Sequence, residues 1–198
     1  MMSALVHAEI DGQRLDDDAI LQESLLILVG GDETTRHVIT GGMEALLRHP
    51  TEQREARRRT RRSIPTAVEE MLRWVTPIQN MNRTGDARRR ARRARASAPA
   101  TRCCCSTRPA NRDERVFPHA PTSSTSTASR TSTSRSATAR HFCLGASLAR
   151  LELRVHVRDA ARRGCRDIEL RPARAPLRRR PSNFIVGIAT MPVAFAAR

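Results

Sequence analysis

The 198-residue sequence contains no lysine and no tyrosine, and it has one tryptophan and four phenylalanines. All 36 of its basic residues are therefore arginine, which against 20 acidic residues gives a formal net charge of +16. Nucleic-acid-binding proteins gain affinity from basic charge, but they commonly add lysine and stacking aromatic residues. A basic balance made of arginine alone is more typical of GC-rich coding than of a nucleic-acid-binding surface.

Long apolar runs are also absent, which bounds the location of the protein. The longest apolar run, 25–29, is too short to span a bilayer, and no secretory apolar region opens the chain. We therefore expect a soluble, cytoplasmic protein with no membrane association. In the reducing cytoplasm, disulfides among the five cysteines are not expected.

Large aliphatic residues are missing from two segments, 84–110 and 118–140. Segments of this composition cannot bury enough apolar surface to offset chain entropy, so we predict irregular or disordered structure in both. They fall within 84–140, which divides the chain. On either side, 1–83 and 141–198 have more ordinary globular composition and carry the motifs.

Apolar periodicity predicts three helices, at 16–49, 65–74 and 144–155. The first begins at the acidic residues 16–18, which favour a helix N-terminus, and it carries two glycines at 30–31. These glycines cost about 1 kcal/mol each relative to alanine, so they mark a weak point in the helix. The third helix places four apolar residues on one face: Leu144, Leu148, Leu151 and Val155.

Two motifs lie on the first two predicted helices. The sequence GGDETT places Glu33 and Thr34 at the weak point, where an acid and a hydroxyl can handle protons. The structural alternative there is a helix kink, with the threonine hydroxyl bonded to a preceding carbonyl. The sequence EEMLRW places Glu70 and Arg73 three residues apart on one helical face, where they can pair. By itself, that spacing is most typical of a solvated surface pair.

A third motif, HFCLGASLARLEL at 141–153, places Cys143 just before a helix. The free N–H groups at a helix N-terminus favour a thiolate there. The structural alternative is a cysteine that serves as a small buried apolar residue.

Together and in this order, the three motifs resemble the C-terminal half of a cytochrome P450, a haem-thiolate monooxygenase. The similar segments cover somewhat over half of the chain and are closest to actinobacterial P450s that oxidise steroid side chains. The resemblance implies a mainly α, partial P450 fold. It also implies haem b (iron protoporphyrin IX) as cofactor, a ferredoxin or ferredoxin reductase as electron donor, and a lipophilic small-molecule substrate such as a steroid. It implies no specific nucleic-acid partner.

The resemblance assigns the reacting groups first. Cys143 matches the ligand of the haem iron, the thiolate that favours O–O cleavage in this family. Glu33 and Thr34 match the distal acid and hydroxyl that deliver protons to iron-bound oxygen.

The resemblance also assigns supporting residues. His141 and Arg83 match positions that meet the haem propionates, and Glu70 with Arg73 matches a buried structural pair that braces the proximal side. The chain departs from the family at the haem loop, where 136–140 reads SATAR in place of the glycine-containing Phe-Gly-x-Gly.

Three adjacent cysteines, Cys103 to Cys105, match no zinc-ligand spacing. A run of leucines in GC-rich codons, Leu-Leu-Leu-Leu-Tyr-Pro, becomes Cys-Cys-Cys-Ser-Thr-Arg when its first base is dropped, and this is the sequence of 103–108. In the same way, Leu-Ala-Phe-Gly-Tyr-Gly-Ala becomes the Ser-Arg-Ser-Ala-Thr-Ala-Arg of 134–140. We interpret the chain as a frameshifted P450 fragment in which compensating indels switch the reading frame.

Three functional interpretations remain open from the sequence. The chain is a P450 monooxygenase by ancestry that is inactive as this fragment, or it is a nonfunctional product of a frameshifted gene or of a sequencing error. The third is a basic polypeptide that binds nucleic acid nonspecifically through the arginine-rich stretches 85–95 and 174–180.

Overall fold

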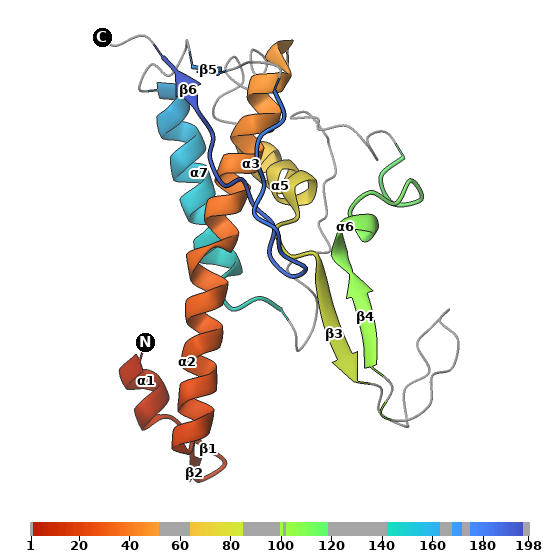
Figure 1. Cartoon of the computed structure of the whole chain (residues 1–198). Coiled ribbons are helices and arrows are strands. Elements are labelled where there is room, and N and C mark those ends of the chain that lie inside the picture. The colour runs from red at the N-terminus through yellow and green to blue at the C-terminus, as the bar shows by residue number, and fades with distance from the viewer. Residues whose placement is uncertain are drawn as a thin grey trace.

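The structure is a computed structural model, and it consists mainly of helices with short antiparallel strand pairs (Figure 1). The mainly α fold class is therefore confirmed. The residues described below are 2–51, 64–84, 100, 102–118, 142–162, 168–171 and 175–195.

The N-terminal part contains a short helix and a hairpin before the first long helix. Helix α1 (Met2–His7) is followed by the antiparallel strands β1 (Glu9–Ile10) and β2 (Gln13–Arg14). Helix α2 (Asp17–Asp32) then begins at Asp16, whose carboxylate accepts a 2.8 Å hydrogen bond from a backbone N–H three residues further on. Such an N-cap satisfies one of the free donors of the first turn and stabilises the helix start.

The predicted helix at 16–49 is confirmed, but it consists of two helices, α2 and α3 (Thr34–Arg48), with an interruption at Glu33. The hydroxyl of Thr34 donates a 2.6 Å hydrogen bond to the carbonyl oxygen of Gly30, four residues earlier. Hydroxyls bonded back in this way commonly bend helices. The kink considered from the sequence is therefore present, and it coincides with the acid–hydroxyl motif.

The hydrophobic core lies between α3, α5 (Ile64–Val75) and α7 (Ala146–Arg162). The helices predicted at 65–74 and 144–155 are thus confirmed, although α7 begins two residues later than predicted and continues to Arg162. Each buried aliphatic side chain stabilises the fold by about 1.5–3 kcal/mol. The buried core residues are Val38, Ile64, Val68, Met71 and Leu153.

The apolar face predicted for the third helix is not its packing face. Its four residues, Leu144, Leu148, Leu151 and Val155, are between 49% and 85% exposed. Helix α7 instead buries Leu153, which lies on the opposite side of the helix at about 100° per residue. The reason is that α3 and α5, the helices against which α7 packs, lie on that opposite side.

A strand corrects the prediction of irregular structure through 84–110. Strand β4 (Arg102–Ser106) pairs antiparallel with β3 (Asn80–Thr84), and the short helix α6 (Thr107–Ala110) follows it. A strand ladder joins backbone groups, which every residue other than proline supplies, so this pairing needs no buried aliphatic side chain. The prediction for 85–99 and for 119–140 lies outside the described residues.

The C-terminal segment folds back along α3 (Figure 1). Its backbone forms an antiparallel pair in which Ala189 N–H donates to Arg178 O at 2.8 Å and Arg180 N–H donates to Gly187 O at 2.9 Å. Strands β5 (Glu169–Leu170) and β6 (Val193–Ala194) form a second short pair. Among the described residues, no helix is long and apolar enough to cross a membrane.

Candidate functional site

The acid–hydroxyl motif lies where α2 meets α3. Thr34 is the first residue of α3 and follows Glu33 directly, and its hydroxyl proton is used in the bond to Gly30 O. No other atom lies within 4 Å of where a Cβ would stand on Gly30 or Gly31. The space beside these two glycines is therefore open.

Two arginines and a histidine surround the carboxylate of Glu33. Arg36 Nη2 lies 2.5 Å from Glu33 Oε1, His37 Nε2 lies 3.1 Å from Oε2, and Arg180 Nη1 lies 3.8 Å from Oε1. The hydrogen bond with His37, followed by the charge of Arg36, lowers the pKa of Glu33 below its usual value. The Glu33 carboxylate therefore has Arg36 at one oxygen and His37, a side chain that can exchange a proton with it, at the other.

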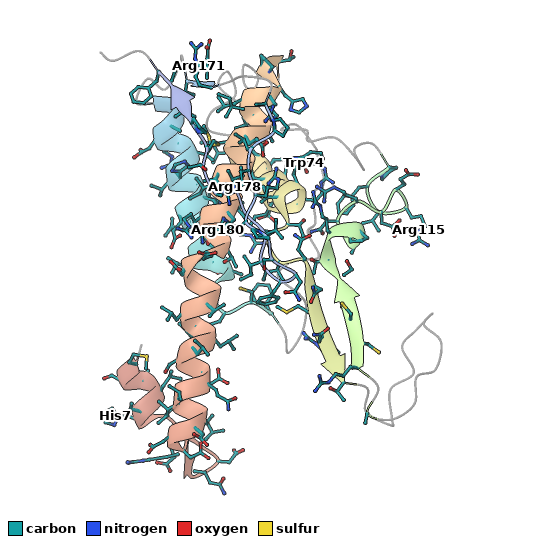
Figure 2. The ribbon with its side chains drawn as sticks, in the orientation of Figure 1. His7, Trp74, Arg115, Arg171, Arg178 and Arg180 are labelled. Carbon is teal, nitrogen blue, oxygen red and sulfur yellow. The ribbon has the colours of Figure 1, made fainter. Side chains whose placement is uncertain are left out.

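His37 is a residue of the site that sequence analysis missed. Its ring is buried and packs directly on the backbone of the C-terminal segment: a Cβ on Gly187 would lie 1.9 Å from His37 Nδ1. Figure 2 shows Arg180 of the same segment lying over the helices near this junction. The spacing of four residues from Glu33 could have identified His37, but no local signal links it to Gly187.

Cys143 lies in the turn before α7, and its thiol is exposed. Its carbonyl oxygen accepts a 3.1 Å hydrogen bond from the backbone N–H of Ala146, the first residue of the helix. Arg150, one turn into the helix, is held by Glu69 at 2.5 Å. That carboxylate raises the pKa of Arg150, and the nearby Cys143 sulfur contributes in the same direction.

The structure joins Glu70 and Arg73 in a buried ion pair on α5. Arg73 donates from Nε to Glu70 Oε2 at 2.8 Å and from Nη2 to Oε1 at 2.6 Å, and the two residues are 1% and 2% exposed respectively. The solvated surface pair considered from the sequence is therefore wrong. A fork of two parallel hydrogen bonds fixes the geometry of both side chains.

Residues from a later segment complete this buried network. Arg73 Nη1 donates to the carbonyl oxygen of Asn111 at 2.8 Å, and the Phe117 ring lies 5.1 Å from the guanidinium. The side-chain amide of Asn111 donates to the hydroxyl of Thr76 at 3.0 Å. Thr76 has a positive φ of 44°, an uncommon conformation for a β-branched residue. Sequence analysis did not identify Asn111 or Thr76.

The two residues predicted to meet haem propionates are only partly described. Arg83 is exposed on β3, and its Nη1 donates to the neighbouring Asn82 carbonyl at 2.8 Å. His141 lies outside the described residues.

The three adjacent cysteines lie on β4 opposite β3. Cys104 and Cys105 are exposed, Cys103 is half-buried, and Cys104 is paired in register with Asn82. In the part of the chain that is described, no group of three or more His, Cys, Asp or Glu residues could hold a metal ion.

Comparisons with known proteins give the same kind of relative throughout. The chain is 42% identical over 197 residues to a steroid C26-monooxygenase of Mycolicibacterium smegmatis, covering 98% of this chain and 47% of that protein. It is 37% identical over 198 residues to a methyl-branched lipid omega-hydroxylase of Mycobacterium bovis, covering 99% of this chain and 45% of that protein. The chain thus spans about half the length of the curated relatives it matches. No family model matches it.

Solved structures agree with the sequence relatives. The chain superposes on the cytochrome P450 PksS of the Bacillus subtilis bacillaene polyketide synthase with a TM-score of 0.83 and 30% identity, covering 98% of this chain and 50% of that chain. A cytochrome P450-like monooxygenase of microbial secondary metabolism gives a TM-score of 0.84 and 30% identity, covering 96% of this chain and 51% of that chain.

Proposed function

We propose that this chain, which belongs to the cytochrome P450 family and corresponds to its C-terminal half, derives from a monooxygenase. Its substrate would be lipophilic, either a steroid or a branched lipid. One observation carries the proposal. An acid–hydroxyl helix junction, a buried Glu-x-x-Arg pair and an exposed cysteine before a helix occur in one chain. Its relatives are named for hydroxylation of steroids and lipids.

The described residues fit a haem at the Cys143 end. The thiol is exposed, and a Cβ on the neighbouring Gly145 would have no atom within 4 Å. The side chains of Phe142 and Leu144 on either side of the cysteine are exposed and apolar, which suits a flat apolar macrocycle. Bound haem would supply activation of molecular oxygen at its iron. Cys143 would hold that iron through its thiolate, and His141 and Arg83 would hold the propionates.

The distal residues would handle protons and water. The hydroxyl of Thr34 donates its hydrogen bond to Gly30 O, so the hydroxyl oxygen can still accept one from a water or a substrate hydroxyl. Glu33 would receive protons at Oε1 and Oε2, with His37 as the neighbouring group able to exchange one. A ferredoxin or ferredoxin reductase would supply electrons, and the protein would work in the cytoplasm.

We further propose that the 198-residue chain is inactive because its reading frame is shifted in the haem loop. In the family the loop glycines let the backbone pass close under the porphyrin, and the SATAR of 136–140 offers no glycine there. One sequence pattern supports the shift: GC-rich codons for a run of leucines, read one base later, give the Cys-Cys-Cys-Ser-Thr-Arg of 103–108, whose cysteines lie on β4. No observation favours the nucleic-acid alternative.

The test is a reduced, carbon-monoxide difference spectrum on two haem-loaded proteins. One is the 198-residue chain, and the other is a frame-restored chain preceded by the N-terminal half of a relative. Each is measured with and without Cys143→Ser. We expect a thiolate-type band from the frame-restored protein alone, abolished by Cys143→Ser.

Two results would contradict separate parts of the proposal. No band from the frame-restored protein, or a band that survives Cys143→Ser, refutes Cys143 as the ligand. A band from the 198-residue chain that is lost in Cys143→Ser shows that the shifted loop still holds haem, and it refutes the inactive-fragment reading.

A further inference from the structure

The two-stranded sheet of β3 and β4 carries three sulfur atoms on one of its faces. Side chains alternate between the two faces of a strand, so Cys103 and Cys105 lie on one face and Cys104 lies on the other. Residues paired in register share a face, and Met81 is paired with Cys105. Met81, Cys103 and Cys105 therefore gather on the same side of the sheet, and we call these three residues the sulfur face.

The sulfur face is accessible from solvent. Met81 is 38% exposed, Cys105 is exposed and Cys103 is half-buried. The thiols of both cysteines are free. Figure 1 shows the ribbon of β3 and β4 extending away from the packed helices α3, α5 and α7. A small ion can therefore reach the sulfurs without any rearrangement of the core.

We propose that the sulfur face binds one copper(I) ion, with the thiolates of Cys103 and Cys105 as its main ligands and the Met81 thioether as a weaker third. Thiolate and thioether sulfurs are the soft ligands that select copper(I). Zinc takes four ligands in a tetrahedron, and among the described residues no group of three or more His, Cys, Asp or Glu could hold a metal ion. Copper(I), by contrast, is held by as few as two sulfurs. The inference does not depend on the proposed function.

The spacing of the two cysteines along β4 suits a bridging ion better than a disulfide. Same-face neighbours on a strand have Cα atoms about 6.8 Å apart, which is twice the rise per residue. That distance is the upper limit of what a disulfide usually spans, about 4.4–6.8 Å. An ion between the two sulfurs lengthens the bridge by two metal–sulfur bonds, each about 2.3 Å in the case of zinc. Both thiolates can therefore lean toward one ion while the strand stays paired.

The charges around the sulfur face also favour the complex. Each thiol releases its proton on binding, so one copper(I) ion and two thiolates form a complex with a single negative charge and no change of oxidation state. Arg83 is paired in register with Cys103 and so lies on the same face, where it supplies a positive charge. Neither β3 nor β4 carries an acidic residue that would oppose it.

The experiment is an anaerobic titration of the 198-residue chain with the copper(I) acetonitrile complex, in competition with the coloured copper(I) chelator bicinchoninate. Every protein carries Cys143→Ser and Cys165→Ser, which leaves the three adjacent cysteines as its only thiols. Cys103→Ser and Cys105→Ser each remove one proposed ligand. Cys104→Ser is the matched control, because Cys104 is exposed on the same strand but lies on the other face.

We expect one copper(I) ion per chain, with an affinity at least about tenfold lower in Cys103→Ser and in Cys105→Ser, because each leaves a single thiolate on the sulfur face. Cys104→Ser should bind copper(I) as tightly as its parent. Met81→Leu should weaken binding by about threefold, since a thioether is a neutral ligand. Met2→Leu, which replaces an exposed methionine outside the sheet, should leave the affinity unchanged.

Three results would overturn the inference. They are no copper(I) retained against the chelator, an equal loss of affinity in Cys104→Ser and Cys103→Ser, and a copper-dependent dimer on size-exclusion chromatography. The second is the behaviour of three thiols without strand geometry, and the third would place the ion between two copies of the chain. An unchanged affinity in Met81→Leu would refute the thioether as a ligand. Because the titration uses neither haem nor Cys143, its outcome is independent of the carbon-monoxide spectrum.

Discussion

Replacing Arg73 with alanine should destabilise the protein more than any exposed substitution. The side chain is 1% exposed and donates three hydrogen bonds, two to Glu70 and one to the Asn111 carbonyl. Removing one partner of a buried ion pair costs about 3–5 kcal/mol, because a desolvated charge stays behind. Native domains are stable by only about 5–15 kcal/mol, so Arg73→Ala should remove a large share of the total.

The assay is urea unfolding followed by far-ultraviolet circular dichroism. With a slope of about 2 kcal/mol per molar urea, the midpoint should fall by about 2 M. Arg115→Ala is the matched control, since Arg115 also makes two bonds to a carboxylate, at 2.9 and 2.6 Å, but its side chain is 85% exposed. Its midpoint should scarcely move.

Replacing both partners separates the cost of leaving a buried charge unpaired from the cost of losing the ion pair itself. Glu70→Leu combined with Arg73→Met removes both charges and should recover much of the stability lost in Arg73→Ala, because apolar pairs often replace buried ion pairs without loss. If Arg73→Ala lowers the midpoint no more than Arg115→Ala does, the Glu70–Arg73 network does not stabilise the fold, and the reasoning fails.

Two further predictions concern close packing and charge. Gly187→Ala should lower the thermal midpoint, because its Cβ would lie 1.9 Å from His37 Nδ1 and overpacking costs about 1–3 kcal/mol. Gly31→Ala, whose Cβ would have nothing within 4 Å, should raise the midpoint, because alanine favours the helix over glycine by about 1 kcal/mol of unfolding free energy. Equal shifts in the two variants would contradict the packing of Gly187 against His37. The Arg115 side chain lowers the pKa of Asp113 from 3.8 to about 2. A lowered pKa in the folded state means that this stabilisation is full above about pH 4 and is lost as the pH falls toward about 2. An NMR titration should show the low pKa and its return toward 3.8 in Arg115→Ala, and an unchanged titration there would exclude the guanidinium as the cause.

The residues of the candidate site differ in how far the sequence could place them. Glu33, Thr34 and Cys143 were identified because each stands in a short motif beside a helix end or a weak point. His37 and Asn111 were missed, because each acts through a contact with a distant segment, Gly187 in one case and Arg73 in the other. Such contacts leave no periodic signal in the chain.

The sequence by itself determined where helices form, since apolar spacing, acidic first turns and breakers act within a few residues of one another. It also indicated the resemblance to the cytochrome P450s, because three motifs in that order are specific. Only the tertiary structure decided which faces are buried. The side of α7 that holds Leu153 packs in the core because α3 and α5 lie there, while the richer apolar stripe from Leu144 to Val155 stays exposed. Strand β4 likewise forms despite its cysteines, because pairing with β3 joins backbone to backbone across the fold, whatever side chains the strand carries.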